Sequence, residues 1–153
     1  MEHETFAYTI GMEQNEIEER LRSTKTGVLA LANDSDAYAV PLAHHYDGEV
    51  LYFRLGEKAK GRKDAFLENT RVASYVVYGT EETENATELE SWSIIATGSV
   101  HELSESERDQ FGPERINRWF APLRVFGESI PELEITITKF EIDTIVGRRT
   151  PSQ

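Results

Sequence analysis

Apolar and polar residues alternate along most of the chain, which predicts a protein built mainly of β-strands. The alternation is clear at residues 38–46, where every second side chain shares one face. Asp47-Gly48, a favoured tight-turn pair, follows directly, and residues 49–54 form the expected return strand of a hairpin. Pro41 lies inside the first strand and has no N–H to donate, so we expect irregular pairing or a free strand edge there.

The same reasoning extends to the rest of the chain and gives six strands in all. The other four are expected at residues 28–32, 72–78, 92–103 and 133–142. Gly98 inside residues 92–103 indicates a bulge or a close backbone approach, with a bend of the strand at that point. In the last strand the apolar positions change parity, which predicts a second bulge near residues 138–139. Residues 80–90 are polar, hold five glutamates and are expected to form an exposed loop.

Helical spacing of apolar residues occurs in three other segments. These are residues 13–23, residues 57–68, and residues 104–120, which begin with a capping-box pattern and are divided by Gly112-Pro113. The strands are thus linked mostly as hairpins, with a helix inserted after the third and others before the last. This order favours a small six-stranded antiparallel barrel with peripheral helices over an alternating βαβ sheet.

Composition narrows the class of protein further. The 153 residues fit one domain, residues 1–153, and the net charge of −12 disfavours general binding to nucleic acid or to an anionic membrane. No cysteine is present, so disulfides and thiolate metal sites are excluded. His44 and His45 are adjacent and face opposite sides of a strand, so we expect no metal site. With no apolar run of about 18 residues, we expect a cytoplasmic protein; the acid excess fits either a salt-adapted or an ordinary acidic protein.

Positive charge is concentrated in one stretch of this acidic chain. Six bases and three acids fall between residues 54 and 71: Arg54, Lys58, Lys60, Arg62, Lys63 and Arg71 against Glu57, Asp64 and Glu68. They surround a predicted strand-to-helix junction, where the first helical turn offers free N–H groups that suit a phosphate. A solvated charged helix face is the alternative. A P-loop does not fit, because an aspartate stands where Ser or Thr should bind magnesium.

Four segments in sequence order resemble the FMN-binding split barrel of the pyridoxamine 5′-phosphate oxidase-like superfamily. They are AVPLAHHYD at 39–47, LYF at 51–53, GRKDAFLENTRV at 61–72 and WSIIATGSVHEL at 92–103. The similarity is closest to the branch of nitroimidazole-resistance proteins. The resemblance implies a split barrel that forms homodimers, with each FMN at the subunit interface.

The resemblance also implies which residues bind FMN. The Arg62-Lys63 pair, with Lys60 nearby, would bind the phosphate. The isoalloxazine would lie along one strand and its return strand, and a later strand would contact the flavin or its tail. The residues that correspond are Val40, Pro41 and Leu42, then Tyr52 and Phe53, and finally Trp92 and Ser93.

His44 and Arg54 are candidates for contact with the substrate, while no catalytic residue can be named. His44 would either donate a proton near the flavin or form hydrogen bonds at a strand end.

The functional expectation is an FMN-dependent oxidoreductase. It would pass electrons from a reduced nicotinamide or deazaflavin donor to a small organic acceptor, with the chemistry supplied by the flavin. The alternative is a non-catalytic carrier of flavin or haem on the same fold. An oligonucleotide-binding barrel is the weakest hypothesis, because the basic side chains are not interleaved with aromatic ones on a sheet face.

Overall fold

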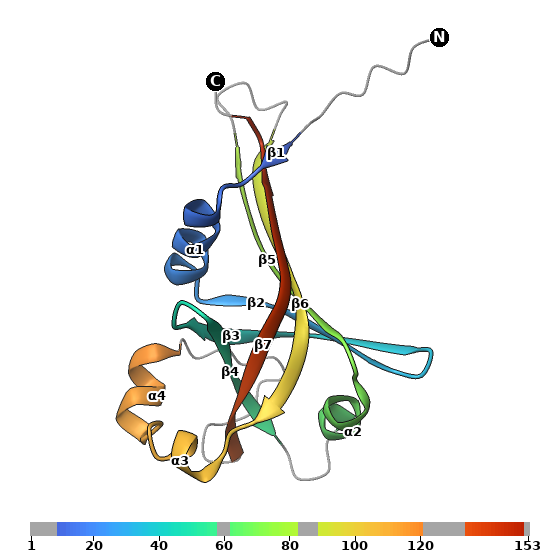
Figure 1. Ribbon diagram of the computed structural model, residues 1–153, viewed down its shortest axis with the longest axis vertical. Coiled ribbons are helices and arrows are strands. Elements are labelled where there is room, and N and C mark those ends of the chain that lie inside the picture. The colour runs from blue at the N-terminus through green and yellow to red at the C-terminus, as the bar shows by residue number, and fades with distance from the viewer. Residues whose placement is uncertain (1–8, 58–61, 83–88, 121–133, 152–153) are drawn as a thin grey trace.

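The computed structural model describes residues 9–57, 62–82, 89–120 and 134–151. Six long antiparallel strands are joined in the order β7-β4-β3-β2-β5-β6, and β6 pairs back with β7, so the sheet closes into a barrel (Figure 1). The strands are β2 Thr26–Asn33, β3 Asp36–Tyr46, β4 Val50–Glu57, β5 Ala73–Glu82, β6 Leu89–Glu102 and β7 Glu134–Arg149. The predicted six-stranded antiparallel barrel is confirmed.

A short strand and four helices complete the described part of the chain. Strand β1, Ile10–Gly11, pairs with the end of β7 and was not predicted. The helices are α1 Gln14–Ser23, α2 Arg62–Asn69, α3 Glu105–Arg108 and α4 Pro113–Trp119. None of the helices in these described ranges is long and apolar enough to cross a bilayer.

Two predicted boundaries are wrong for the same physical reason, which is that strand pairing continues further than local composition indicates. Helix α2 begins at Arg62 and not near residue 57, because β4 stays paired with β7 as far as Glu57. Strand β5 continues to Glu82 and β6 starts at Leu89, so both extend into the segment predicted as a loop. Ladder hydrogen bonds between the two strands outweigh the poor strand propensity of glutamate there.

The bulge predicted at Gly98 is confirmed. Thr97 of β6 is paired with Thr144, but Gly98 is paired with Ile142, so β7 holds one extra residue at this point. A side chain at position 98 would run into the carbonyl oxygen of Glu141, which explains why glycine is needed. The extra residue reverses the inward and outward positions of β7 beyond it.

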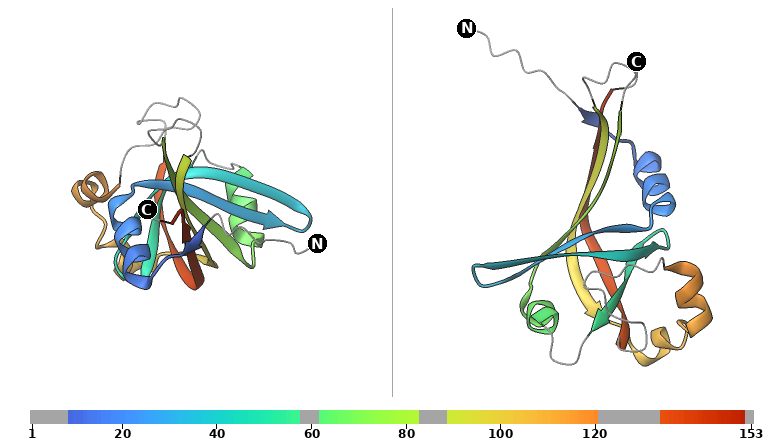
Figure 2. Two further views of the ribbon diagram at one scale, coloured as in Figure 1. Left: turned by 90° about the horizontal axis from the view of Figure 1, so that it is seen from above. Right: turned by 180° about the vertical axis from the view of Figure 1, so that it is seen from behind.

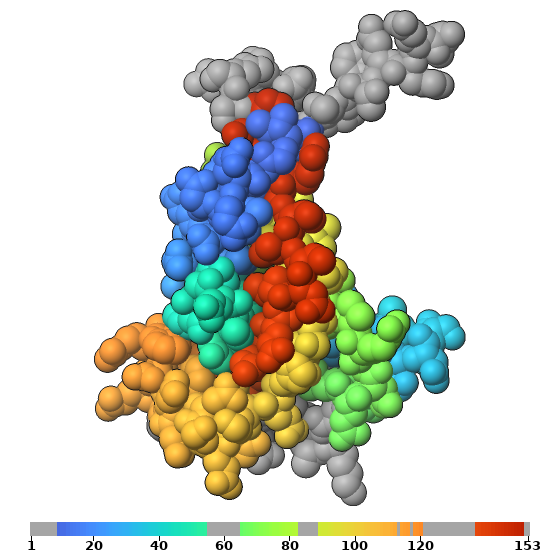
Figure 3. All heavy atoms as spheres, viewed as in Figure 1, coloured from blue at the N-terminus to red at the C-terminus, as the bar shows by residue number. Residues whose placement is uncertain are grey.

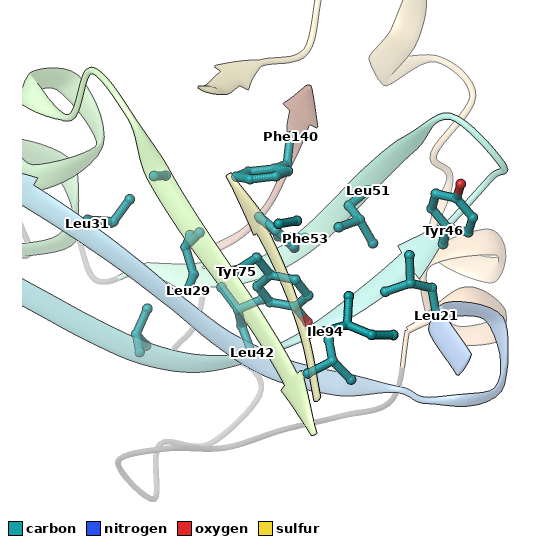
Figure 4. Packing of buried hydrophobic residues seen from close by; sticks show 14 of the residues in the cluster. Leu21, Leu29, Leu31, Leu42, Tyr46, Leu51, Phe53, Tyr75, Ile94 and Phe140 are labelled. Carbon is teal, nitrogen blue, oxygen red and sulfur yellow. The ribbon is translucent and has the colours of Figure 1, made fainter. Parts of the chain in front are cut away.

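The second bulge, expected near residues 138–139, is absent: pairing of β7 with β4 is continuous from 134 to 141. The parity change arises because β7 packs against two cores. Phe140 points into the barrel (Figure 4), where a large cluster includes Phe53 and Tyr75. Ile137 points outward into a second cluster with Phe120 of the segment that covers this face. Both faces of this part of β7 are therefore apolar, without a change of register.

Candidate functional site

Strand β3 is paired on both sides for only part of its length. On one side, β2 pairs with β3 from Asp36 to Ala43. On the other, β4 pairs with β3 only from Ala43 to Tyr46 and then diverges. The β4-facing edge of residues 36–42 is therefore free of strand partners in the described part of the chain. We call the opening between this edge and β4 the β3–β4 fork.

Pro41 lies on the free edge, as its missing N–H requires. A two-residue turn joins Asn33 and Asp36, so this pair is hydrogen-bonded, and the alternation along the ladder makes Val28–Pro41 a non-hydrogen-bonded pair. The nitrogen of Pro41 consequently faces the β4 side, where β3 has no partner. The free edge predicted from this proline is confirmed.

The two faces of β3 at the fork differ in character. The side chains of Val40 and Leu42 are 2% and 3% exposed and belong to the barrel core. Ala39 and Pro41, the alternate residues, are exposed. The fork thus presents backbone groups and small side chains, while the larger residues of β3 hold the strand in place from behind. Such a surface lets a flat molecule approach the strand closely.

Arg54 stands where β3 and β4 separate. It is paired with Ala43, the last residue of β3 that both neighbouring strands share. Its side chain is half-buried, and burial lowers the pKa of its guanidinium. Among the residues that the structure describes, none forms an ion pair with Arg54. The fork therefore contains a partly desolvated cation that can accept an anionic partner.

Helix α2 borders the tip of the β2–β3 hairpin, which projects from the barrel in Figure 2. Phe66 of the helix stacks on Tyr38 with ring centroids 5.2 Å apart, and Thr70 bonds to both backbone groups of Ala32. Because α2 begins at Arg62, the backbone of the Arg62-Lys63 pair forms its first turn. Lys60, also expected at the phosphate, lies outside the described residues.

The return-strand residues expected at the flavin lie on opposite faces of β4. Phe53 is fully buried in the barrel, 4.6 Å from Tyr75 between ring centroids. Tyr52 packs outward against Phe111, with centroids 5.2 Å apart. Burial raises the pKa of the Tyr52 phenol, and the nearby carboxylates of Asp47 and Glu107 add a smaller effect in the same direction. Phe53 can therefore shape the fork only from behind, and Tyr52 belongs to the second core.

Trp92 and Ser93 lie elsewhere on the barrel. They are paired with Arg149 and Arg148 of β7, and β2 and β5 separate their strand from β3. The guanidinium of Arg20 sits 4.7 Å from the Trp92 ring. The structure therefore does not bring these two residues together with the fork of the same chain.

His44 is 1% exposed and both of its ring nitrogens are hydrogen-bonded. Nε2 lies 3.0 Å from the carbonyl oxygen of Leu21, which can only accept, so Nε2 carries the proton. Nδ1 then accepts from the hydroxyl of Tyr75 at 2.5 Å. Burial lowers the pKa of His44 and raises that of Tyr75, so both are neutral at pH 7. In this arrangement neither ring nitrogen is free for a substrate.

The comparison with protein families decides the identity. The model of the family described as pyridoxamine 5′-phosphate oxidase matches residues 13–149, from the start of α1 to the end of β7. The chain belongs to the pyridoxamine 5′-phosphate oxidase family. No curated protein sequence matches it.

Several solved structures share the fold of this family member. The proposed 5-nitroimidazole antibiotic resistance protein of Bacteroides thetaiotaomicron has a TM-score of 0.69 and 19% identity, over 92% of this chain and 87% of that one. An FAD-binding protein of Mesorhizobium loti has a TM-score of 0.66 and 20% identity, over 94% and 98%. An FAD- and haem-binding protein of Mycobacterium smegmatis has a TM-score of 0.61 and 15% identity, over 95% and 74%.

Sequence reasoning about this oxidase-family chain missed Tyr75, the partner of His44. Thirty-one residues separate the two, and no local pattern connects them. The signal that was available is Gly27. A side chain there would come within 2.5 Å of the Tyr75 hydroxyl, so a glycine at the start of a strand marks the close approach of another side chain.

Proposed function

We propose that this member of the pyridoxamine 5′-phosphate oxidase family binds FMN at the β3–β4 fork and works as an oxidoreductase. It would pass electrons from a reduced nicotinamide or deazaflavin donor to a small organic acceptor. The observation that carries the proposal is the free edge of residues 36–42 beside a half-buried arginine without an ion pair among the described residues. Bound FMN would supply the reversible two-electron chemistry.

The chain's own residues would hold and orient the coenzyme. The backbone groups of Ala39 and the carbonyl of Pro41 point to the free edge, where they fit the polar rim and flat face of a flavin ring. Val40 and Leu42, whose backbone groups bond to β2, hold this stretch of strand in place beside the ring. Arg62 and Lys63 at the start of α2, with Lys60 before them, would bind the phosphate through charge-assisted hydrogen bonds. Core residues such as Phe53 support the strand from the inside and keep water out.

Arg54 is the better of the two candidates for contact with the substrate. Its partly buried cation stands at the fork, where it would bind an anionic group or stabilise negative charge on the ring. His44 has both ring nitrogens engaged. We therefore assign His44 to positioning: it ties β3 to Leu21 and to Tyr75, which sets the strand along which the flavin would lie.

Titration of the protein with FMN tests the proposal. Replacing both Arg62 and Lys63 with alanine removes two charge-assisted contacts of about 1.5–3 kcal/mol each, so affinity should fall at least about 100-fold. The matched control changes Arg108 and Arg115, which are exposed on α3 and α4, to alanine. It loses the same charge and should keep its affinity within about threefold. Equal losses in both double variants, or unchanged affinity in the first, would reject the phosphate site.

We also propose that two copies associate through an apolar row on the outer barrel face. Four residues, one from each of four adjacent strands, are direct cross-strand neighbours: Val28, Val76, Ile95 and Val146. Ile95 is 43% and Val146 58% exposed. Such a self-complementary strip fits a twofold dimer. A second copy would also supply a Trp92-Ser93 pair from another barrel, which the fork lacks within one chain.

Sedimentation velocity tests this dimer. Ile95→Glu places a charge in the centre of the row and should convert the protein to monomer, because an unpaired buried charge costs several kcal/mol. Leu89→Glu alters another exposed apolar residue, at the far end of the same strand, and should leave the dimer intact. A wild-type monomer that still binds FMN would contradict the proposed interface.

A non-catalytic carrier of flavin or haem is the second candidate, because one solved structure of this fold is a protein named for binding both FAD and haem. The two functions differ in one measurement. Under anaerobic conditions, the bound flavin of an oxidoreductase should be bleached by NADH, NADPH or a reduced deazaflavin. A flavin that none of these donors reduces would favour the carrier.

A further inference from the structure

A second concave feature lies at the other end of β3, away from the fork. It is a cleft of ≈ 340 Å³ between the end of α1, the last residues of β3 and α4. In Figure 3 the β3–β4 hairpin lies between α1 and the α3–α4 segment. Its size falls within the range of small-molecule sites, about 300–1,000 Å³.

The cleft is cationic although the protein as a whole is strongly acidic. Arg22, Lys25 and Arg118 line it, and none of the described residues that line it is acidic. Within the described ranges, none of these three bases forms an ion pair. Three unpaired cations in one concavity of a chain of net charge −12 create a local positive potential.

Two carboxylates that act electrostatically on residues of the cleft, Asp47 and Glu18, have hydrogen-bond partners of their own. Asp47 accepts from the backbone N–H groups of Glu49 and Val50, each at 2.8 Å, and caps the hairpin turn. Glu18 accepts from the hydroxyl of Tyr46 at 3.4 Å. Neither carboxylate neutralises the bases of the cleft by direct pairing.

Flat rings line the same cleft. The imidazole of His45 stacks on the indole of Trp119, with centroids 4.1 Å apart and planes 18° from parallel. Burial lowers the pKa of His45; Lys25 lowers it further, and Asp47 opposes the shift. The ring is therefore neutral at pH 7. Arg22 lies 5.5 Å from the centroid of the Tyr46 ring, and both residues line the cleft. The cleft thus combines stacked aromatic rings with fixed positive charge.

We propose that this cleft binds a small aromatic carboxylate, with the ring against Trp119 and His45 and the carboxylate among Arg22, Lys25 and Arg118. Guanidinium groups match the geometry of a carboxylate, and aromatic rings select for a flat ligand. The site does not rest on the flavin proposal, because the fork uses residues 36–42 and Arg54, and the cleft uses neither.

Calorimetric titration with benzoate and benzamide tests the charge and the ring together. The two probes have the same flat ring and differ in charge, so benzoate should bind at least about tenfold more tightly. Inorganic phosphate, an anion without a ring, should bind more weakly than benzoate. Equal affinity for benzoate and benzamide, or phosphate binding as tightly as benzoate, would overturn the proposal.

Variants on one helix locate the binding. Arg118→Gln should weaken benzoate about tenfold, the loss of one charge-assisted hydrogen bond, and Lys25→Gln provides an independent second change. Arg115→Gln is the matched control: Arg115 lies on α4, 4.9 Å from the Trp119 ring, but does not line the cleft. It should alter benzoate affinity less than about twofold. Similar losses in the variants at 115 and 118 would overturn the site.

Saturating FMN provides the last arm. Benzoate should bind with the same affinity in its presence and absence, because the proposed sites occupy different halves of β3. Displacement of benzoate by FMN would overturn a separate site and would leave the test of FMN binding at Arg62 and Lys63 unaffected.

Discussion

Residues 36–42 and residues 43–46 form one continuous strand, β3, yet they differ in how their edges are used. The second half is paired with β4, and His44 within it is fastened to α1 and β5 by both ring nitrogens. The first half has no strand partner on one edge within the described part of the chain, and it exposes Ala39 and Pro41. Because residues 43–46 are held by β4 and by His44, residues 36–42 can stay ordered although one of their edges has no strand partner in the described chain. The barrel thereby obtains an ordered backbone edge that a ligand can use.

Moving a proline from the free half of β3 to its paired half should have the largest effect on stability. The N–H of Ala43 points the same way as the nitrogen of Pro41, but at residue 43 that side is occupied by Arg54. Ala43→Pro would therefore remove a ladder hydrogen bond from a doubly paired position and should lower the free energy of unfolding by about 3 kcal/mol or more. Urea denaturation followed by circular dichroism measures the change.

Pro41→Ala is the matched control on the free half. No ladder bond depends on residue 41, so only the stiffness of the unfolded chain changes, and stability should fall by less than about 1 kcal/mol. Comparable losses from the two substitutions would mean that the two halves of β3 are equally constrained, and the fork would lose its structural basis.

Local sequence was sufficient for the parts of the barrel that local chemistry decides. The hairpin at Asp47-Gly48, the bulge at Gly98 and the free edge at Pro41 were all predicted, since each follows from the backbone preferences of one or two residues. The parity change in β7 was misread because Ile137 faces a second core. That core is built by helices about 20–30 residues earlier in the chain, and alternation within one strand cannot reveal it.

The candidate sites divide in the same way. Clustered charge marked the junction at residues 54–71, and the family resemblance singled out Arg62 and Lys63 within it. Helix α2 begins at Arg62 and not near residue 57, where apolar spacing had placed its start. The cationic cleft combines Arg22 and Lys25 with Arg118, which lies far from both in sequence. Only the closure of the barrel and the placement of α4 bring them together. Composition counts each of them as one base in an acidic surface.

The pH dependence of stability gives a finer test of the fixed half. Burial lowers the pKa of His44 from its ordinary value of 6.5, so the unfolded chain binds a proton more readily than the folded protein. Stability is then fully present above about pH 6.5 and is lost as the pH falls below it, by at most about 1.4 kcal/mol per pH unit for one proton. His44→Gln should lower stability at pH 7.5 and flatten its decline between pH 6.5 and 5.5.

His45, the next residue, separates this effect from histidine titration in general. Its pKa is also lowered by burial, but the ring is only half-buried and Asp47 opposes the shift. His45→Gln should therefore flatten the decline less than His44→Gln does. If the His45 variant loses the larger part of the slope, the fixed half of β3 is not held by His44. In that case its anchoring lies in the His45–Trp119 stack on the opposite face, and rigidity of the strand comes from the second core and not from the barrel interior.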